Sequence, residues 1–423
     1  MLDASILALL ILIVTGVLFA TRAVSMGMAS LIGVLLMLIT GIVTPDDIGK
    51  GFGSNMCLFV ANVNVISAAV FETGLAGRIG RLICSSDWLV HNERRFLAAI
   101  ITFAGIMTMF VANVPVVALF LPICSAVAAS SEGRIEKKNI IMAMGFAGSI
   151  GGTGSLIGSS VNLTGAASLE ATTGDTLGMF TMLPATCVLL GCVLVYYATV
   201  GYSLQKRWFT FSEEREESSA VDTTFHRKRA AIVGIIFIAM MAGLMKGLWN
   251  FAVVSMIATL ACILTNCISM EKAVKSIEWD IVIMLAMSTV MANGINQSGL
   301  GVLAARTMLD LCGGQEASSY LLLGLAVFVS SGLSCVMLNN TVTAILIPIF
   351  CSMAQLIGSN PVVFAIAIIC GCNICYATPI STTAIAMTAV GGYRFSDYVR
   401  VGGILTLISD IFLVLALPLL YGV

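Results

Sequence analysis

Charged residues are scarce in this sequence, and their scarcity bounds the class of protein. Of 423 residues, only 10% are Asp, Glu, Lys or Arg, whereas 59% are hydrophobic and the mean hydropathy is +1.03. A soluble domain carries about 25% charged residues. Apolar stretches of about 20 residues recur along the whole chain, which is the pattern of transmembrane helices. The sequence therefore predicts an all-α polytopic membrane protein embedded in the lipid bilayer.

Residues that build enzyme and metal sites are also few or badly placed. The chain has two histidines, His91 and His226, and both lie in polar connectors. Most of its 13 cysteines occur singly in apolar runs, where cysteine behaves as a small hydrophobe. Cys372 and Cys375 have CxxC spacing, but no second pair or histidine cluster would complete a tetrahedral metal site. Because HExxH and GxSxG motifs are absent too, we predict no enzyme activity and no cofactor.

The net charge of −1 gives no reason to expect nucleic-acid binding. The first apolar stretch, residues 4–20, lacks the basic n-region and the cleavage site of a signal peptide, so we interpret it as a membrane helix.

The predicted membrane segments are 4–21, 26–44, 54–73, 139–160, 180–204, 230–247, 251–268, 279–297, 361–390 and 401–421.

Two further apolar stretches, 96–130 and 320–353, are too long for one crossing and are interrupted at asparagine motifs. Each is interpreted either as two full helices or as a re-entrant hairpin that enters and leaves by the same face. Both interpretations add an even number of crossings, so the topology of the flanking segments is the same.

Basic residues orient the predicted helices, because cytoplasmic connectors are enriched in Lys and Arg. The basic segment 205–229 is placed in the cytoplasm, which puts both termini on the non-cytoplasmic side of the cell (inner) membrane. Only Lys50, Lys246 and Arg306 then fall outside. The cytoplasmic side receives Arg22, Arg78, Arg81, Arg94, Arg95, Arg134, Lys137, Lys138, Lys206, Arg207, Arg215, Arg227, Lys228, Arg229, Lys272, Lys275, Arg394 and Arg400. The connector 161–179 is assigned to the outside.

An internal repeat links the two halves of the chain. Asn113 precedes Pro122 as Asn339 precedes Pro348, and the second pair lies 226 residues further along (113 to 339). At the same offset Gly151-Gly152-Thr153 falls opposite Ala377-Thr378-Pro379, and Ser155 opposite Ser381. "FETGLAGRIGRL" at 71–82 is echoed by "NQSGLGVLAARTM" at 296–308.

Each half comprises three helices, one broken hairpin and two more helices. Five net crossings is an odd number, so the second half starts on the opposite face. The sequence thus predicts inverted-topology repeats at 1–204 and 230–423, joined by the cytoplasmic linker 205–229.

Four places interrupt apolar helices with helix-breaking residues or oxygen ligands: 112–115, 148–155, 338–343 and 371–383. A helix that begins inside the membrane aims free N–H groups at an anion, and an unwound stretch with Asn, Ser and Thr oxygens suits Na⁺. Taken singly, such residues often serve only to hydrogen-bond neighbouring membrane helices together. Paired by the repeat, Asn113 and Asn339 favour a functional interpretation.

The order of motifs is similar to a known family. Asn with a following Leu/Ile-Pro, then "IGGTGSLIGSSVNL", then "ATPISTTAI" and "RFSDYVRVGG" resembles the ion transporter superfamily over about residues 50–420. Within it, the chain looks most like the divalent anion/sodium symporters, which carry dicarboxylates, citrate or sulfate. The resemblance implies a homodimer in which a transport domain slides as an elevator against a scaffold domain. It also implies re-entrant hairpins whose tips meet the broken helices 139–160 and 361–390.

The resemblance further implies which residues bind the ligands. Na⁺ would bind at Asn113, Gly151, Gly152, Thr153, Asn339 and Ala377. The anion would bind at Asn113, Asn339, Asn340, Thr341, Thr378, Pro379 and Ser381. The family typically has Ser-Asn-Thr at both tips, whereas this chain has Ala-Asn-Val and Leu-Asn-Asn. Asn-Asn at the second tip looks more like the arsenite and citrate branches of the superfamily.

Asp410 is the one acid deep in a predicted membrane segment, and Pro184 occupies its repeat-related position. It is a candidate for binding a coupling proton or cation, or else makes a polar contact to a neighbouring helix. The leading hypothesis is a secondary transporter that couples a small anion to Na⁺. Arsenite-type efflux or Na⁺/H⁺ antiport is the alternative within the superfamily. A channel and a membrane-embedded enzyme have less support.

Overall fold

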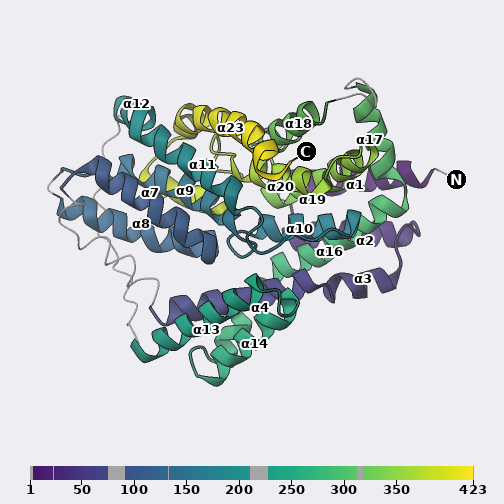
Figure 1. Cartoon of the computed structure of the whole chain (residues 1–423), viewed down its shortest axis with the longest axis horizontal. Helices are drawn as coiled ribbons and strands as arrows, with labels where there is room; N and C mark the ends of the chain where they lie inside the picture. The colour runs from purple at the N-terminus through teal and green to yellow at the C-terminus, as the bar shows by residue number, and fades with distance from the viewer. Residues whose placement is uncertain are drawn as a thin grey trace.

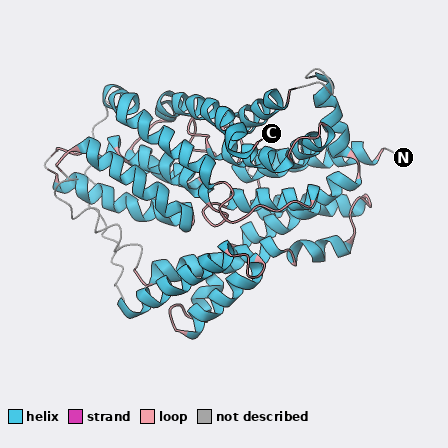
Figure 2. Ribbon diagram, in the orientation of Figure 1, coloured by secondary structure: helices cyan, strands magenta, loops and turns pink. Residues whose placement is uncertain are grey.

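The structure is a computed structural model that describes residues 3–21, 23–74, 91–131, 133–209, 227–311 and 318–422. The described residues form helices joined by turns and loops, with no strand among them (Figure 2). The all-helical prediction is confirmed. Arg22, Arg78, Arg81 and Arg215, much of the 71–82 motif and most of the linker 205–229 lie outside the described residues.

In the first half the helices are α1 (Ala4–Thr21), α2 (Met26–Ile39), α3 (Pro45–Phe52), α4 (Asn55–Glu72), α7 (Glu93–Phe110), α8 (Asn113–Ser130), α9 (Ile141–Gly151), α10 (Ser160–Thr173), α11 (Leu183–Tyr196) and α12 (Tyr202–Trp208). In the second half they are α13 (Arg227–Met245), α14 (Phe251–Leu264), α15 (Met270–Lys275), α16 (Trp279–Gln297), α17 (Leu300–Leu311), α18 (Ser319–Ser334), α19 (Asn339–Leu356), α20 (Pro361–Asn373), α21 (Thr383–Ala386), α22 (Phe395–Asp397) and α23 (Gly403–Tyr421).

Helix starts follow local capping chemistry. The side chain of Ser25 accepts a hydrogen bond from the Met28 amide at the start of α2, and Asn250 accepts one from Val253 at the start of α14. Such caps satisfy amides that have no partner inside the helix. Pro361 stands in the first turn of α20, where a proline costs no hydrogen bond.

Both long apolar stretches are interrupted helix pairs. Residues 96–130 fall within α7 and α8, which are separated only by Val111 and Ala112, and residues 320–353 fall within α18 and α19. Helices α8 and α19 each have 18 residues and begin at the repeat-related asparagines. The predicted interruptions are therefore present; whether each pair is re-entrant stays a prediction.

One segment differs from its expected form. Residues 161–179 are predicted as a connector outside the membrane, but most of them form α10, whose first ten residues are buried except for Ser160. Helix α10 packs against α16, α19 and α20. Its Ser, Thr, Ala and Gly residues give it low hydropathy, and these small side chains allow the close packing that buries it.

Apolar helices are numerous enough for a polytopic membrane protein. Among the described residues, six helices are long and apolar enough to cross a membrane: Pro45–Glu72, Leu183–Trp208, Arg227–Met245, Trp279–Gln297, Asn339–Leu356 and Phe395–Tyr421. Shorter apolar helices, including α1, α2, α14 and α20, coincide with other predicted membrane segments, and α18 falls in the interrupted stretch 320–353.

The helices form two groups (Figure 1). Helices α3, α4, α13 and α14 lie together, while α7, α8, α9, α11, α18, α20 and α23 form a second group. Helix α10 lies between the groups: it packs on α4 of the first and on α20 of the second, and also on α16 and α19.

Packing partners recur at the 226-residue offset. Helix α2 packs on α16 and α14 packs on α4; α7 pairs with α9 as α18 pairs with α20. In the same way, α8 lies on α9 and α19 lies on α20. These pairings bring the starts of α8 and α19 towards the ends of α9 and α20.

Candidate functional site

Both hairpin tips contact one short segment, residues 155–160, which comprises the loop before α10 and the first residue of that helix. The Asn113 amide at the first tip donates to the Gly158 carbonyl at 3.0 Å. At the second tip, Asn340 Nδ2 lies 3.0 Å from Ser160 Oγ. The two predicted tips therefore meet around the same few residues, although they come from opposite halves of the chain.

The first tip faces the break after α9. There a single 3-10 turn, Gly152–Gly154, replaces regular helix. Asn162 Nδ2 donates to the carbonyls of Gly152 and Ser155, each at 2.7 Å. Ser155 Oγ donates to the Met109 carbonyl, just before the tip.

The predicted Na⁺ residues of the first half lie in this break. A Cβ at Gly152 would stand 3.4 Å from Asn113 Cβ, so that residue lies directly against the tip. Thr153 follows it, but its hydroxyl is already bonded to the Ile150 carbonyl (2.6 Å) and to Thr186 Oγ1 (2.7 Å).

Two glycines make this approach of backbones possible. A Cβ at Gly151 would lie 2.1 Å from the Gly105 carbonyl oxygen of α7. At Gly158 it would lie 2.3 Å from the carbonyl oxygens of both Gly152 and Thr108. Since backbone oxygens cannot move aside as a side-chain end can, only glycine fits at these positions.

The second tip faces the segment after α20, which contains Ala377 and Pro379. Cys375 Sγ donates to Asn339 Oδ1 at 3.3 Å, and Thr378 Oγ1 donates to the Cys335 carbonyl at 2.9 Å. Ser381 Oγ bonds the Cys375 carbonyl at 3.2 Å. The predicted residues Asn339, Thr378 and Ser381 are therefore brought together around this break.

The tips contain buried polar atoms without a partner. Asn339 and Thr341 are 2% and 1% exposed, and Asn339 Nδ2 and Thr341 Oγ1 have no hydrogen-bond partner among the described residues. The same holds for Asn162 Oδ1 beside the first break. Leaving such atoms unpaired costs about 1–3 kcal/mol each. The amide N–H suits an anion, and the oxygens suit a hard cation.

The electrostatics of the site come from dipoles. None of the tip and break residues named above carries a charge. Helices α8, α10 and α19 all begin there, and each contributes the positive end of a helix dipole. An anion at the tips would therefore be held by amides and helix ends.

The two breaks also approach each other. Ser149 Oγ in α9 lies 3.5 Å from the Asn373 carbonyl at the end of α20, and the Phe146 and Tyr376 rings are 4.9 Å apart. Thr406 of α23 donates to the Ile374 carbonyl at 3.0 Å and so braces the second break.

Asp410 makes its hydrogen bond to α18 and not to a tip residue. It is 2% exposed on α23, and its Oδ2 accepts a hydrogen bond from Ser331 Oγ of α18 at 2.7 Å. Its Oδ1 is buried without a partner among the described residues. Of the two roles considered for Asp410 from the sequence, the polar contact to a neighbouring helix is present, as the bond from Ser331.

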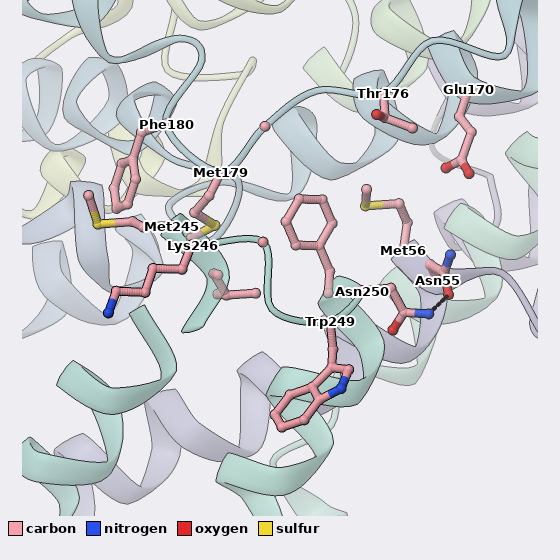
Figure 3. A pocket seen from close by; sticks show the side chains of 14 residues that line it. Asn55, Met56, Glu170, Thr176, Met179, Phe180, Met245, Lys246, Trp249 and Asn250 are labelled. Carbon is pink, nitrogen blue, oxygen red and sulfur yellow. Dashed lines mark hydrogen bonds between the residues drawn. The ribbon is translucent and has the colours of Figure 1, made fainter. Parts of the chain in front are cut away.

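A cavity of about 600 Å³ lies where the two helix groups face each other (Figure 3). Its walls include Asn55 and Met56 of α4, Asn250 of α14, Glu170 of α10 and Phe180 of the connector that follows α10. No residue of either tip is among the described residues that line it. The predicted Na⁺ and anion sites therefore do not lie in this cavity.

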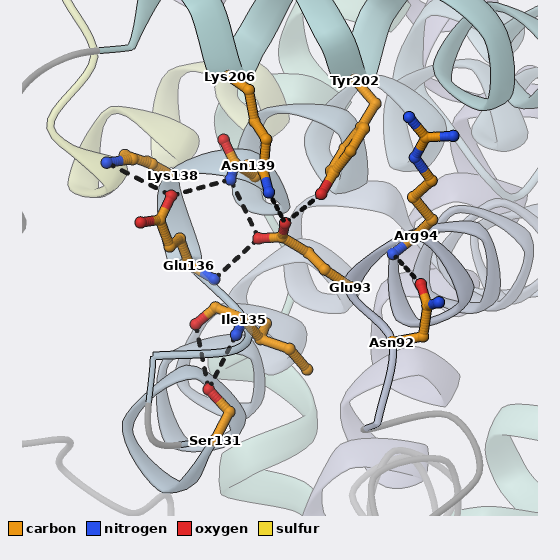
Figure 4. A network of polar contacts seen from close by, with 10 residues as sticks. All are labelled: Asn92, Glu93, Arg94, Ser131, Ile135, Glu136, Lys138, Asn139, Tyr202 and Lys206. Atoms are coloured by element: carbon orange, nitrogen blue, oxygen red, sulfur yellow. Dashed lines mark hydrogen bonds and ion pairs between the residues drawn. The ribbon is translucent and has the colours of Figure 1, made fainter.

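Charges gather instead at the base of the first hairpin (Figure 4). Glu93 Oε1 accepts hydrogen bonds from the Glu136 amide (2.9 Å) and from Asn139 Nδ2 (3.0 Å). Its Oε2 accepts one from the Tyr202 hydroxyl and pairs with Lys206 Nζ at 3.2 Å. The network ties α7, α12 and the connector before α9 together.

Sequence reasoning missed several residues of the site. Asn162 and Ser160 were within a motif singled out for its family resemblance, "IGGTGSLIGSSVNL", but without a role. An amide in a buried helix start is the signal that marks Asn162. Cys375 was considered only for metal binding, whereas its thiol contacts Asn339.

Comparison with known proteins gives the context for this geometry. A model of the citrate transporter family (CitMHS) matches residues 11–314 and, in a second alignment, residues 249–422. The sodium-dependent dicarboxylate transporter SdcS of Staphylococcus aureus (strain NCTC 8325 / PS 47) is 22% identical over 444 residues, covering 95% of this chain and 84% of that protein. An uncharacterized transporter of Haemophilus influenzae is 23% identical over 410 residues, covering 93% and 87%.

Another relative matches over a shorter part. The uncharacterized transporter sll0640 of Synechocystis is 27% identical over 209 residues, which are 49% of this chain and 34% of that protein. The chain thus spans about a third of that relative's length.

Two solved structures are similar along most of the chain. The YdaH transporter of Alcanivorax borkumensis superposes with a TM-score of 0.67 at 15% identity, covering 99% of this chain and 98% of that one. MtrF of Neisseria gonorrhoeae gives 0.63 at 14% identity, covering 92% and 84%. At such low identities the likeness shows the fold alone.

Proposed function

Because this chain belongs to the citrate transporter family and is a membrane transporter rather than an enzyme, we propose that it carries a small di- or tricarboxylate-like anion, or sulfate, together with Na⁺. The observation that carries the proposal is the meeting of both hairpin tips around residues 155–160, with unpaired buried polar atoms at Asn339 and Thr341. The sodium-dependent dicarboxylate transporter among its relatives supports the coupling ion.

The two breaks supply the proposed Na⁺ sites. The first comprises Asn113 with the backbone of Gly151, Gly152 and Thr153. The second comprises Asn339 with the backbone at Ala377. Oxygen ligands from amides and carbonyls are those that Na⁺ prefers, and both breaks offer buried ones.

The anion is placed between the tips, with Asn340, Thr341, Thr378, Pro379 and Ser381 around it besides the two tip asparagines. Asn339 Nδ2 is a buried donor that lacks an acceptor, so an anion oxygen would remove its desolvation cost. Since no cationic side chain is among these residues, bound Na⁺ would offset the charge of the anion. That arrangement makes the two ligands bind cooperatively.

We propose that the two halves are inverted repeats and that transport works as an elevator. The support is the exchange of packing partners at the 226-residue offset, in which α2 on α16 corresponds to α14 on α4. The group containing α4, α13, α14 and α16 would be the scaffold, and the group containing the hairpins would move. The hairpins are then re-entrant and open to opposite faces.

The chain is placed in the cell membrane with both termini on the non-cytoplasmic side, as its basic residues predict. We also propose a homodimer, from the family resemblance. Chemical cross-linking of the protein in native membranes tests the dimer directly: a band of twice the monomer mass is expected.

Uptake into proteoliposomes tests the function. Labelled succinate, citrate and sulfate are offered with a Na⁺ gradient, with K⁺ in its place, and with the gradient collapsed by an ionophore. We expect one of the anions to accumulate only with the Na⁺ gradient. If uptake does not depend on Na⁺, the proposed Na⁺ coupling is wrong. If none of the three anions is taken up, the proposed substrate class is wrong.

Asp410 favours a second candidate function, arsenite-type efflux or Na⁺/H⁺ antiport, because both need an acid that exchanges protons. Its burial deep in α23 meets that requirement. Arsenite efflux from loaded vesicles, and Na⁺-driven proton movement read with a pH-sensitive dye, test the two modes. Full retention of those activities in Asp410→Asn would remove their support.

A further inference from the structure

The described helices that pack most closely against the helix of Asp410 carry no compensating charge. Helix α23 packs against α11, α18 and α20, and the sequences of these three helices contain no Asp, Glu, Lys or Arg. The nearest cation before it along the chain is Arg400, in the turn that precedes α23; it is exposed and ten residues earlier, a rise of about 15 Å in a helix. The carboxyl group is 2% exposed, so water does not supply the missing solvation.

The other titratable side chains on these elements are thiols and phenols. They are Cys187, Cys192 and Tyr196 on α11, Tyr320 and Cys335 on and just after α18, Cys370, Cys372, Cys375 and Tyr376 on and just after α20, and Tyr398 and Tyr421 before and at the end of α23. None of them is a base that would pair with a carboxylate.

Hydrogen bonding does not solvate a charged carboxylate here either. An ionised carboxylate has about four acceptor positions. Asp410 receives one hydrogen bond, from Ser331 Oγ to Oδ2, and Oδ1 has no partner among the described residues. A buried, uncompensated carboxylate is expensive enough that such groups take up a proton or a counter-ion instead.

We propose that the α18–α23 contact is a proton-binding site, separate from the hairpin tips, in which Asp410 holds a proton in this conformation. The proton adds to one carboxylate oxygen from water on one side of the membrane, forming an O–H bond. It leaves to water on the other side when the carboxyl group is exposed, restoring the carboxylate. A proton needs only one oxygen, whereas Na⁺ would need several arranged around it.

The site is positioned to respond to the second hairpin. Ser331 and Cys335 are one helical turn apart, so they lie on the same face near the end of α18. The Cys335 carbonyl accepts the hydrogen bond from Thr378 in the second break. Movement of this hairpin relative to α23 therefore alters the contact to Asp410 and the contact to the substrate region together. This linkage rests on the proposed function; the proton site itself does not.

The first half has no equivalent of this pair. Gly105 occupies the position of Ser331 and Pro184 that of Asp410. The proton site thus belongs to one hairpin only, whereas the proposed Na⁺ sites come in a repeat-related pair.

Infrared difference spectroscopy on the full chain in liposomes tests the proton directly. The C=O stretch of a protonated, buried carboxyl group is separated from that of a carboxylate and shifts in deuterated water. We expect this band in the unmodified protein at neutral pH, its loss in Asp410→Asn, and its retention in Asp175→Asn, a matched change at an exposed acid. An unchanged band in Asp410→Asn, or no band at all at neutral pH, would overturn the proposal.

Transport measured against pH tests the linkage. Asp410→Asn mimics the protonated form, so we expect Na⁺-driven uptake to lose its dependence on pH. Ser331→Ala removes the hydroxyl that favours the carboxylate, so the midpoint of the pH profile should move to higher pH. Profiles identical to that of the unmodified protein in both variants would refute the linkage.

The two proposals fail separately. Loss of the infrared band in Asp410→Asn without Na⁺-driven uptake in the unmodified protein would retain the proton site and remove the symport. Na⁺-driven uptake with an infrared band that Asp410→Asn does not change would retain the symport and remove the proton site.

Discussion

At the scale of single residues, the two hairpin tips differ in what remains available to a ligand. At the first tip the backbone N–H of Asn113 is engaged with Gly158, which leaves the Asn113 side chain as the only polar one there, because its neighbours Ala112 and Val114 are apolar. At the second tip, Asn339, Asn340 and Thr341 follow one another, and two of the three have an unpaired buried polar atom. The second tip therefore contributes more side-chain groups to the proposed anion site.

This asymmetry predicts a ranking of variants. Asn339→Ala combined with Asn340→Ala should raise the KM for the anion about a hundredfold or more, since each lost hydrogen bond to a charged ligand is worth about 1.5–3 kcal/mol and tenfold is about 1.4 kcal/mol. Asn113→Ala should raise it less and should mainly weaken Na⁺ activation. Uptake kinetics at fixed Na⁺, and then at fixed anion, separate the two effects. The reverse ranking would place the anion nearer the first tip.

Glu93 allows a prediction about pH and stability. Burial by itself raises the pKa of Glu93, but the hydrogen bonds from Tyr202, the Glu136 amide, Asn139 and Lys206 outweigh it and hold the pKa below its ordinary value. A carboxyl group with a lowered pKa stabilises the fold above its unfolded-state pKa of about 4.3 and loses that effect as the pH falls through its folded-state value.

We therefore expect the unmodified protein to lose thermal stability as the pH is lowered from about 5 towards its acid limit, and Glu93→Gln to lose less over the same range. Midpoints of thermal unfolding in detergent measure this. Glu271→Gln is the control, because Glu271 is exposed and makes only an ion pair within α15. Equal acid sensitivity in Glu93→Gln and the unmodified protein would contradict the prediction.

At the scale of helices, the sequence predicted where helices break better than where they run. Asparagine, glycine and proline in apolar stretches pointed to the ends of α7 and α18 and to the turn at Gly152–Gly154, because these residues act through local backbone chemistry. Helix α10 was missed, since its residues are neither strongly apolar nor strongly periodic. Its burial depends on α16, α19 and α20, which a local pattern does not contain.

Glycine in the first break gives a test at this scale. Gly158→Ala would place a Cβ 2.3 Å from two carbonyl oxygens, so we expect destabilisation of about 1–3 kcal/mol or more and loss of Na⁺-driven uptake. Gly191→Ala in α11 is the matched control. Nothing lies within 4 Å of its Cβ position, and alanine favours a helix over glycine. Unfolding midpoints that are equal in the two variants would refute the packing argument.

At the scale of the whole molecule, the candidate site depends on contacts between halves of the chain. Asn340 meets Ser160, and Tyr196 of α11 donates to the Val401 carbonyl at 2.9 Å, across 205 residues. The recurrence of motifs 226 residues apart made the pairing of tips and breaks predictable. It did not reveal that both tips meet one short segment, because Asn162 and Ser160 have no repeat-related counterparts of the same type. The site is assembled by tertiary packing between dissimilar segments.

The elevator proposal can be tested by fixing the two helix groups together. Asn296 of α16 donates to the Ala171 carbonyl of α10 at 3.2 Å, across the proposed boundary between scaffold and moving domain. Asn250, the cap residue of α14, donates from Nδ2 to Asn55 Oδ1 of α4 at 3.2 Å, within the proposed scaffold. In a background without accessible native cysteines, such as the exposed Cys187, each pair is replaced by two cysteines and oxidised.

We expect the disulfide between positions 296 and 171 to abolish uptake and its reduction to restore it, because α10 must slide along α16 if the hairpins cross the membrane as one body. The disulfide between positions 250 and 55 should leave uptake unchanged, because α4 and α14 move together. Substrate binding, measured by thermal stabilisation, should survive in both, since neither pair lies at the tips. Full uptake with positions 296 and 171 cross-linked would mean that the α10–α16 contact is stationary during transport. Helix α10 would then belong to the scaffold and not to the moving domain.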